Sequence, residues 1–236
     1  MLEDTPFFPQ LAHHCGPAAL ATVLGAAGVE PGYDAVVERV YVPGLQGTLQ
    51  VEMMAAARGY DRIPFRVPGT LEDVLAQVEA GTPVLVLQNL RIRTWPAWHY
   101  AVVIGYDRER RRILMRSGTV PELATPVGRW MRQWDWASRW GIVVLRPGEL
   151  PARPKRANVY RALADFDERG RPEFRLAAWS AAAGRWPGDV LPRVGMANAL
   201  LALKRSEEAE ERYREALVID AGHWPARLNL ANLLLE

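Results

Sequence analysis

The sequence is poor in features that mark several classes of protein. Its 236 residues include one cysteine, Cys15, so no intramolecular disulfide can form. It has no uninterrupted run of about 18 apolar residues, which argues against a membrane-spanning helix. The formal net charge is only +2, with 29 basic and 27 acidic residues spread along the chain. Nothing in this charge pattern favours a nucleic acid partner.

Cys15 stands where a proline-broken segment meets an apolar stretch. The alanine- and leucine-rich residues 18 to 27 predict a helix, with Pro17 in its first turn and Gly28 at its end. Free amide N–H groups and the macrodipole at a helix N-terminus favour a thiolate, so we expect a lowered pKa for Cys15. Gln10 lies five residues upstream. Its carboxamide and the N–H of Cys15 would together stabilise an oxyanion.

The segment QLAHHCGPAAL resembles the active-site opening of papain-like cysteine peptidases, in particular the bacteriocin-processing peptidases that cut after double-glycine leaders. The residues that carry this resemblance are Gln10, Cys15, Gly16 and Pro17. His14 stands where that family usually has Asp. The resemblance implies that Cys15 is a nucleophile and that a histidine on a later strand is its general base.

His99 is the predicted base, because WHYAVVIGYD resembles the His-Phe/Tyr-Val-Val segment that carries the base in that family. The other histidines fit less well. His13 and His14 are sequence neighbours of Cys15 at the start of a helix, and His223 lies in a later helical region.

The third catalytic position departs from the family pattern, which has Asp followed by Pro on the strand after the histidine. Ser117 and Gly118 align there. Asp107 is too distant, since eight residues of strand at about 3.3 Å each span roughly 26 Å. Ser117 is therefore the predicted group that orients His99. A hydroxyl lacks the charge that stabilises imidazolium, so we expect weak activity, or binding without cleavage.

The predicted fold class is α+β, in the order of a papain-like domain, over residues 1–147. Thr48 and Thr70 are predicted N-caps, and Asp73 strengthens the second cap. Further helices are expected at 33–41, 49–59, 71–81 and 128–138, a short extended stretch at 61–68, and strands at 83–90, 99–106, 112–117 and 141–145.

A proline-rich charged linker is predicted at 148–156, followed by helical repeats at 157–236. Residues match at a spacing of 34: Trp179 aligns with Tyr213, and Ala182 with Ala216. This spacing resembles tetratricopeptide (TPR) repeats, which implies that the region binds a protein partner.

These features predict a cysteine-dependent hydrolase that cleaves a peptide or amide bond in a peptide or protein substrate, with no cofactor or metal. One alternative is a non-catalytic peptide-binding scaffold with a degenerate peptidase fold. Another is a zinc site, whose ligands would be His13, His14, Cys15 and His99. From the resemblance we expect export to the periplasm or cell envelope, with the cytoplasm as the alternative.

Overall fold

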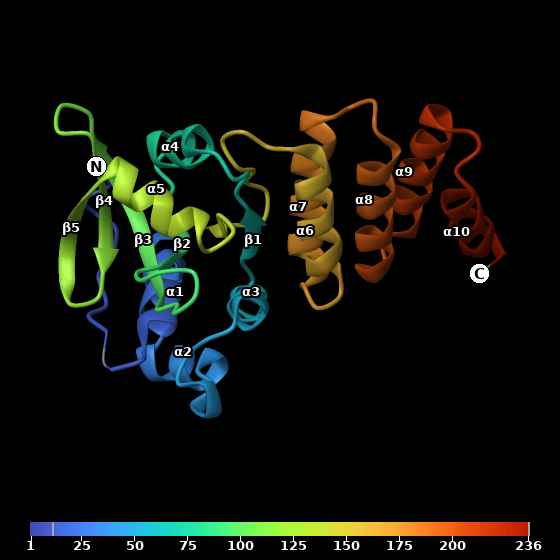
Figure 1. The fold of residues 1–236 in the computed structure, drawn as a ribbon. Coiled ribbons are helices and arrows are strands. Elements are labelled where there is room, and N and C mark those ends of the chain that lie inside the picture. The colour runs from blue at the N-terminus through green and yellow to red at the C-terminus, as the bar shows by residue number, and fades with distance from the viewer. Residues whose placement is uncertain (11, 236) are drawn as a thin grey trace. The chain divides into compact units, whose positions relative to one another are not determined.

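The computed structural model describes residues 1–10 and 12–235, which form two compact units (Figure 1). One unit holds Met1–Leu145 and Pro151–Lys155. The other holds Arg146–Leu150 and the chain from Arg156 onward. Among the described residues, no helix has both the length and the apolar character needed to cross a bilayer.

The helices of the first unit begin near the predicted positions. Their bounds are α1 Cys15–Ala26, α2 Tyr33–Val40, the 3-10 helix η1 Pro43–Leu45, α3 Gln50–Gly59, α4 Leu71–Glu79 and α5 Val127–Asp135. The predicted cap of α4 is confirmed, because Thr70 Oγ1 accepts from the N–H of Asp73 at 3.1 Å. The predicted cap at Thr48 is wrong. Helix α3 begins at Gln50 after an uncapped Leu49, and the carbonyl of Thr48 instead accepts from the Tyr100 hydroxyl at 3.1 Å.

Six antiparallel strands form one sheet, in the order β1-β6-β2-β3-β4-β5. Their bounds are β1 Ile63–Arg66, β2 Val84–Asn89, β3 Trp98–Asp107, β4 Arg112–Ser117, β5 Val120–Pro126 and β6 Gly141–Leu145. The predicted strands and the β3–β4 hairpin are confirmed. Strand β5 was not predicted from the sequence. It is a mostly exposed edge strand containing two prolines, and such a strand lacks the apolar pattern of a buried one.

Helices cover both faces of the sheet, with α1 and α5 on opposite sides (Figure 1). On the α1 side, Leu20 and Leu24 pack with Tyr100, Val102 and other buried apolar side chains. On the other side, Trp130 and Trp134 of α5 are fully buried, and their rings lie 4.9 Å apart between centroids. The central strands β2, β3 and β6 are thus buried on both faces, which explains their nearly continuous apolar sequences.

The second unit is helical from Arg156 onward. Its helices are α6 Arg156–Asp167, α7 Pro172–Arg185, α8 Val190–Ala202, α9 Ser206–Ile219 and α10 Trp224–Leu235, and each packs on the next. Helices α7 and α9 both start and end 34 residues apart, and α8 and α10 start 34 residues apart. The 34-residue period is therefore present in the helices themselves. Their assignment as TPR repeats stays a prediction.

Close packing between these helices depends on small residues. A Cβ on Gly195 of α8 would lie 2.3 Å from the Trp179 ring, so only glycine allows this approach of α8 to α7. Tyr213 is fully buried and donates to Asn198 at 2.6 Å. The aromatic positions that carry the sequence repeat are thus the core of the helix pairs.

Candidate active site

Cys15 is the first residue of α1, as predicted, and it is a free cysteine that is partly exposed. The next residue, Gly16, has no room for a side chain, because Thr48 in the loop after η1 lies very close to it. A Cβ on Gly16 would lie 2.5 Å from the Cβ of Thr48, a distance that side chains do not tolerate. Pro17 occupies the first helical turn, where its missing N–H has no cost. The glycine after Cys15 therefore lets the Thr48 loop lie beside Cys15, where both line one cavity.

The electrostatics of Cys15 differ from the sequence-based expectation of a lowered pKa. Burial raises the pKa of the Cys15 thiol above its usual range, and backbone hydrogen bonds from Tyr100, Gly16 and Cys15 act in the opposite direction without cancelling it. The expectation considered the helix N-terminus alone and left out desolvation, which disfavours the charged thiolate. Burial therefore favours the protonated thiol over the thiolate.

His99 is the second residue of β3, and Ser117 is the last residue of β4. The β3–β4 hairpin brings them together, and His99 Nε2 lies 2.8 Å from Ser117 Oγ. This is the contact that the alignment of Ser117 with the family's Asp predicts. Burial lowers the pKa of His99 below its usual value. With a neutral hydroxyl beside it, the imidazole is uncharged at neutral pH.

Gln10 is held beside this pair through its backbone. Its N–H donates to the carbonyl of Gly118 at 3.1 Å, and Gly118 adopts the left-handed conformation (φ 63°) in the turn after β4. Gln10, Cys15 and His99 line one cavity of about 640 Å³. The four predicted site residues thus converge, three on this cavity and Ser117 on the ring of His99.

Most of the remaining cavity wall comes from η1 with the loop after it and from the start of β3, and His13 and Leu87 also line the cavity. Leu45, Gln46, Thr48 and Leu49 lie on the loop side, and Trp98 lies on the strand side. Leu45, Leu49 and Trp98 are 60%, 44% and 55% exposed. Large apolar side chains that face solvent around a cavity are typical of sites that bind an apolar ligand or peptide.

A metal site at the same residues is not supported by their arrangement. The ring of His14 packs edge-on against Tyr41, with centroids 4.9 Å apart. Within 1–10 and 12–235, no group of three or more His, Cys, Asp and Glu side chains is placed to hold a metal ion.

Comparison of the sequence with models of known protein families identifies one family. The model of the Peptidase_C39 like family matches residues 2–121, which contain Cys15, His99 and Ser117. The chain belongs to this family. No curated protein sequence matches the chain.

One solved structure supports the same fold, and two others match less well. A putative C39-like peptidase from Bacillus anthracis is 17% identical, with 66% of this chain and 98% of that chain covered, at a TM-score of 0.51. Two others are 19% identical. One is the peptidase domain of Streptococcus ComA, a bifunctional ABC transporter of a quorum-sensing pathway, with coverage of 60% and 98% at a TM-score of 0.47. The other is a double glycine motif protease from an AMS/PCAT transporter in complex with its leader peptide, with coverage of 59% and 89% at a TM-score of 0.40.

Sequence reasoning missed Tyr100 and Thr48 in this C39-like domain. Tyr100 follows His99 on β3, and its hydroxyl donates to the carbonyl of Thr48. The side chain of Thr48 in turn lies close to Gly16. The contact fixes the cavity loop against the strand that carries His99. Its only sequence signal is the aromatic residue directly after the histidine, because the partner lies 52 residues away.

The protonation of the resting thiol can be measured directly. Because Cys15 is the only cysteine, iodoacetamide reports on it alone. We expect the alkylation rate to rise with pH through a single inflection above about 8.5, the ordinary thiol value, because only the thiolate reacts and burial raises its pKa. The same protein in urea should titrate near 8.5. A rate plateau that extends below pH 7 would instead mean a preformed thiolate–imidazolium pair.

Proposed function

We propose that the C39-like domain is a cysteine-dependent hydrolase that cleaves a peptide or amide bond. The observation that carries this proposal is the convergence of Cys15, His99 and Gln10 on one cavity, with His99 held by Ser117. A nucleophile, a base and a group that orients the base are the minimum set for acyl transfer through a thiol.

The proposed reaction begins with both groups neutral. The sulfur of Cys15 attacks the carbonyl carbon of the substrate while His99 takes the thiol proton. Since Nε2 of the ring is engaged by Ser117, Nδ1 receives this proton. The N–H of Cys15 and the carboxamide of Gln10 donate to the oxyanion. His99 then protonates the leaving amine as the C–N bond breaks, and water hydrolyses the thioester to regenerate the thiol.

The second candidate is a peptide-binding scaffold that does not cleave. It is favoured by the same electrostatics, since burial disfavours both the thiolate of Cys15 and the imidazolium of His99. Ser117 supplies no charge to offset this. The two functions share the cavity and differ in whether the proton transfer from Cys15 to His99 occurs at a useful rate.

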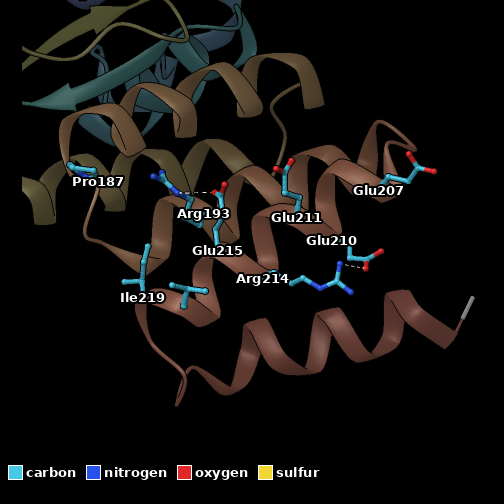
Figure 2. Close-up of a pocket in the computed structure, with 9 residues that line it drawn as sticks. Pro187, Arg193, Glu207, Glu210, Glu211, Arg214, Glu215 and Ile219 are labelled. Carbon is cyan, nitrogen blue, oxygen red and sulfur yellow. Dashed lines mark ion pairs between the residues drawn. The ribbon is translucent and has the colours of Figure 1, made fainter.

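We further propose that the helical unit consists of TPR-like repeats that hold a protein partner. An open hollow of about 650 Å³ is lined mainly by residues of α9, with Arg193 of α8 and Pro187 at its edge. In it Arg193 points toward Glu215 at 3.2 Å (Figure 2). Mixed charges beside the exposed Val218 suit a polar peptide with apolar anchors. By resemblance, we expect such a peptidase–repeat protein to act at the cell envelope.

Cleavage is tested with a synthetic peptide library whose new termini are read by mass spectrometry. We expect Cys15→Ala to abolish cleavage and His99→Ala to lower it by about a hundredfold or more, because the base is lost. His223→Ala, in the helical unit, is the matched control and should cleave normally. Cleavage that persists in Cys15→Ala contradicts the proposal. Peptides that bind to the wild-type protein without being cut would favour the scaffold.

A substitution can introduce at position 117 the negative charge that the Ser117 hydroxyl lacks. We expect Ser117→Asp to raise kcat by about tenfold, because a carboxylate makes a stronger, charge-assisted hydrogen bond to imidazolium than a hydroxyl does. The acid limb of the pH profile should also move to higher pH as the pKa of His99 rises. Thr119→Asp, which adds the same charge in the exposed turn, should change neither. Lower activity in Ser117→Asp with an intact fold would show that Ser117 does not occupy the orienting position.

A further inference from the structure

A cleft of about 560 Å³ lies in the peptidase unit between α5 and the segment that follows β2. Arg129 and Arg132 of α5 and Arg91 after β2 give it three guanidinium groups, and its other lining residues are Leu90, Gln133 and Trp136. Of the described residues that line it, none is acidic. The cleft is therefore a concentration of positive charge in a chain whose charges are otherwise nearly balanced.

The three arginines of this cleft are not neutralised by neighbouring carboxylates. Asp135 is the acidic residue next to Trp136, and it pairs with Arg93 at 3.6 Å and with Arg139 at 3.0 Å. None of the three cleft arginines forms a salt bridge with a described residue. Arg132 instead lies over the Trp136 ring, 5.8 Å from its centroid. Their charges remain available for an anionic ligand.

The arginine cleft lies next to the candidate active site. A smaller cavity of about 240 Å³ is lined by Leu90, Arg129 and Gln133 of the cleft and also by His99 and Ser117. Gln88, the direct neighbour of His99 on β2, bonds to Gln133 on α5 at 3.3 Å. Figure 1 shows α5 running across this face of the sheet. His99 therefore borders two cavities, one with Cys15 and one with Arg129 of the cleft.

We propose that the arginine cleft is a subsite for an acidic side chain of the peptide substrate. The proposal rests on the hydrolase function proposed above and names a feature of its substrate. Guanidinium groups bind carboxylates in a planar, two-bonded geometry that a lysine cannot offer. The smaller cavity of about 240 Å³ is lined largely by apolar atoms, which include those of Met115, Leu123, Ala124 and Pro126. A peptide with an apolar residue between its acidic residue and the scissile bond fits this sequence of surfaces.

A nucleic acid fits the cleft less well. Binding of a phosphate backbone uses a basic surface that extends along several phosphates, whereas these arginines gather in one concavity beside Leu90, which is 44% exposed. The position of the arginines beside a cavity that reaches His99 also ties their ligand to the reacting group. A peptide carboxylate satisfies both observations.

Binding is tested with the full chain carrying Cys15→Ala, so that turnover plays no part. The probes are two labelled 12-residue peptides rich in leucine, one with three glutamates and one with glutamines in their place, followed by fluorescence anisotropy. We expect the glutamate peptide to bind about tenfold more tightly, since hydrogen bonds to charged groups are the stronger ones. Raising the salt concentration should reduce this preference.

When Arg129→Gln and Arg132→Gln are added to the Cys15→Ala variant, its preference for the glutamate peptide should disappear. Arg161→Gln with Lys204→Gln removes the same charge from the helical unit and should leave the preference intact. Equal affinity for the two peptides, binding of neither, an equal loss in the control pair, or equally tight binding of a labelled oligonucleotide would each overturn the subsite. Failure of the hydrolase function would give a different result. The Cys15→Ala variant would still prefer the glutamate peptide, while the wild-type protein would cut no peptide.

Discussion

The hydrogen bond of 2.8 Å between His99 Nε2 and Ser117 Oγ is the contact on which the proposed chemistry depends. It fixes the plane of the imidazole and occupies one of its two nitrogens, which leaves the other for the thiol proton. Because the partner is a hydroxyl, the bond orients the ring without stabilising its charged form. Burial of both His99 and Cys15 acts in the same direction. In the proposed reaction both groups therefore start neutral, and charge separation would have to occur within each cycle.

The surrounding fold serves to hold this pair in place. The β3–β4 hairpin brings Ser117 to His99, and the Gln10 N–H bonded to Gly118 ties the N-terminal segment to the same turn. On the other side, the Tyr100 hydroxyl binds the carbonyl of Thr48, and Thr48 lies close to Gly16, directly after Cys15. Segments far apart in the sequence thus meet at one end of the sheet. In the proposed reaction, a small shift of any of them would disturb the geometry between the thiol and His99.

Much of this arrangement could be predicted from local sequence. The start of α1 at Cys15, the Thr70 cap and the strand after His99 follow from patterns of a few neighbouring residues, and Ser117 follows from the family alignment. The Thr48 cap is wrong because α3 begins at Gln50 after Leu49, one residue later than predicted. The carbonyl of Thr48 binds Tyr100, a partner 52 residues away that no local pattern marks. The raised pKa of Cys15 depends on burial by other segments. Likewise, Arg91 and Arg129 meet only through packing of α5 on the sheet, so no local pattern marks their cleft.

The ¹⁵N NMR spectrum of the His99 ring tests the neutral, hydroxyl-oriented base most directly. The chain has only four histidines, and His99→Asn would assign the signal. We expect an uncharged ring at pH 7 with its proton on Nε2, donated to Ser117, and a pKa below about 6.5. In Ser117→Ala this preference for the Nε2–H tautomer should be lost. A charged His99 at pH 7, or a ring with its proton on Nδ1, would contradict the assignment of His99 as the base that accepts the Cys15 proton.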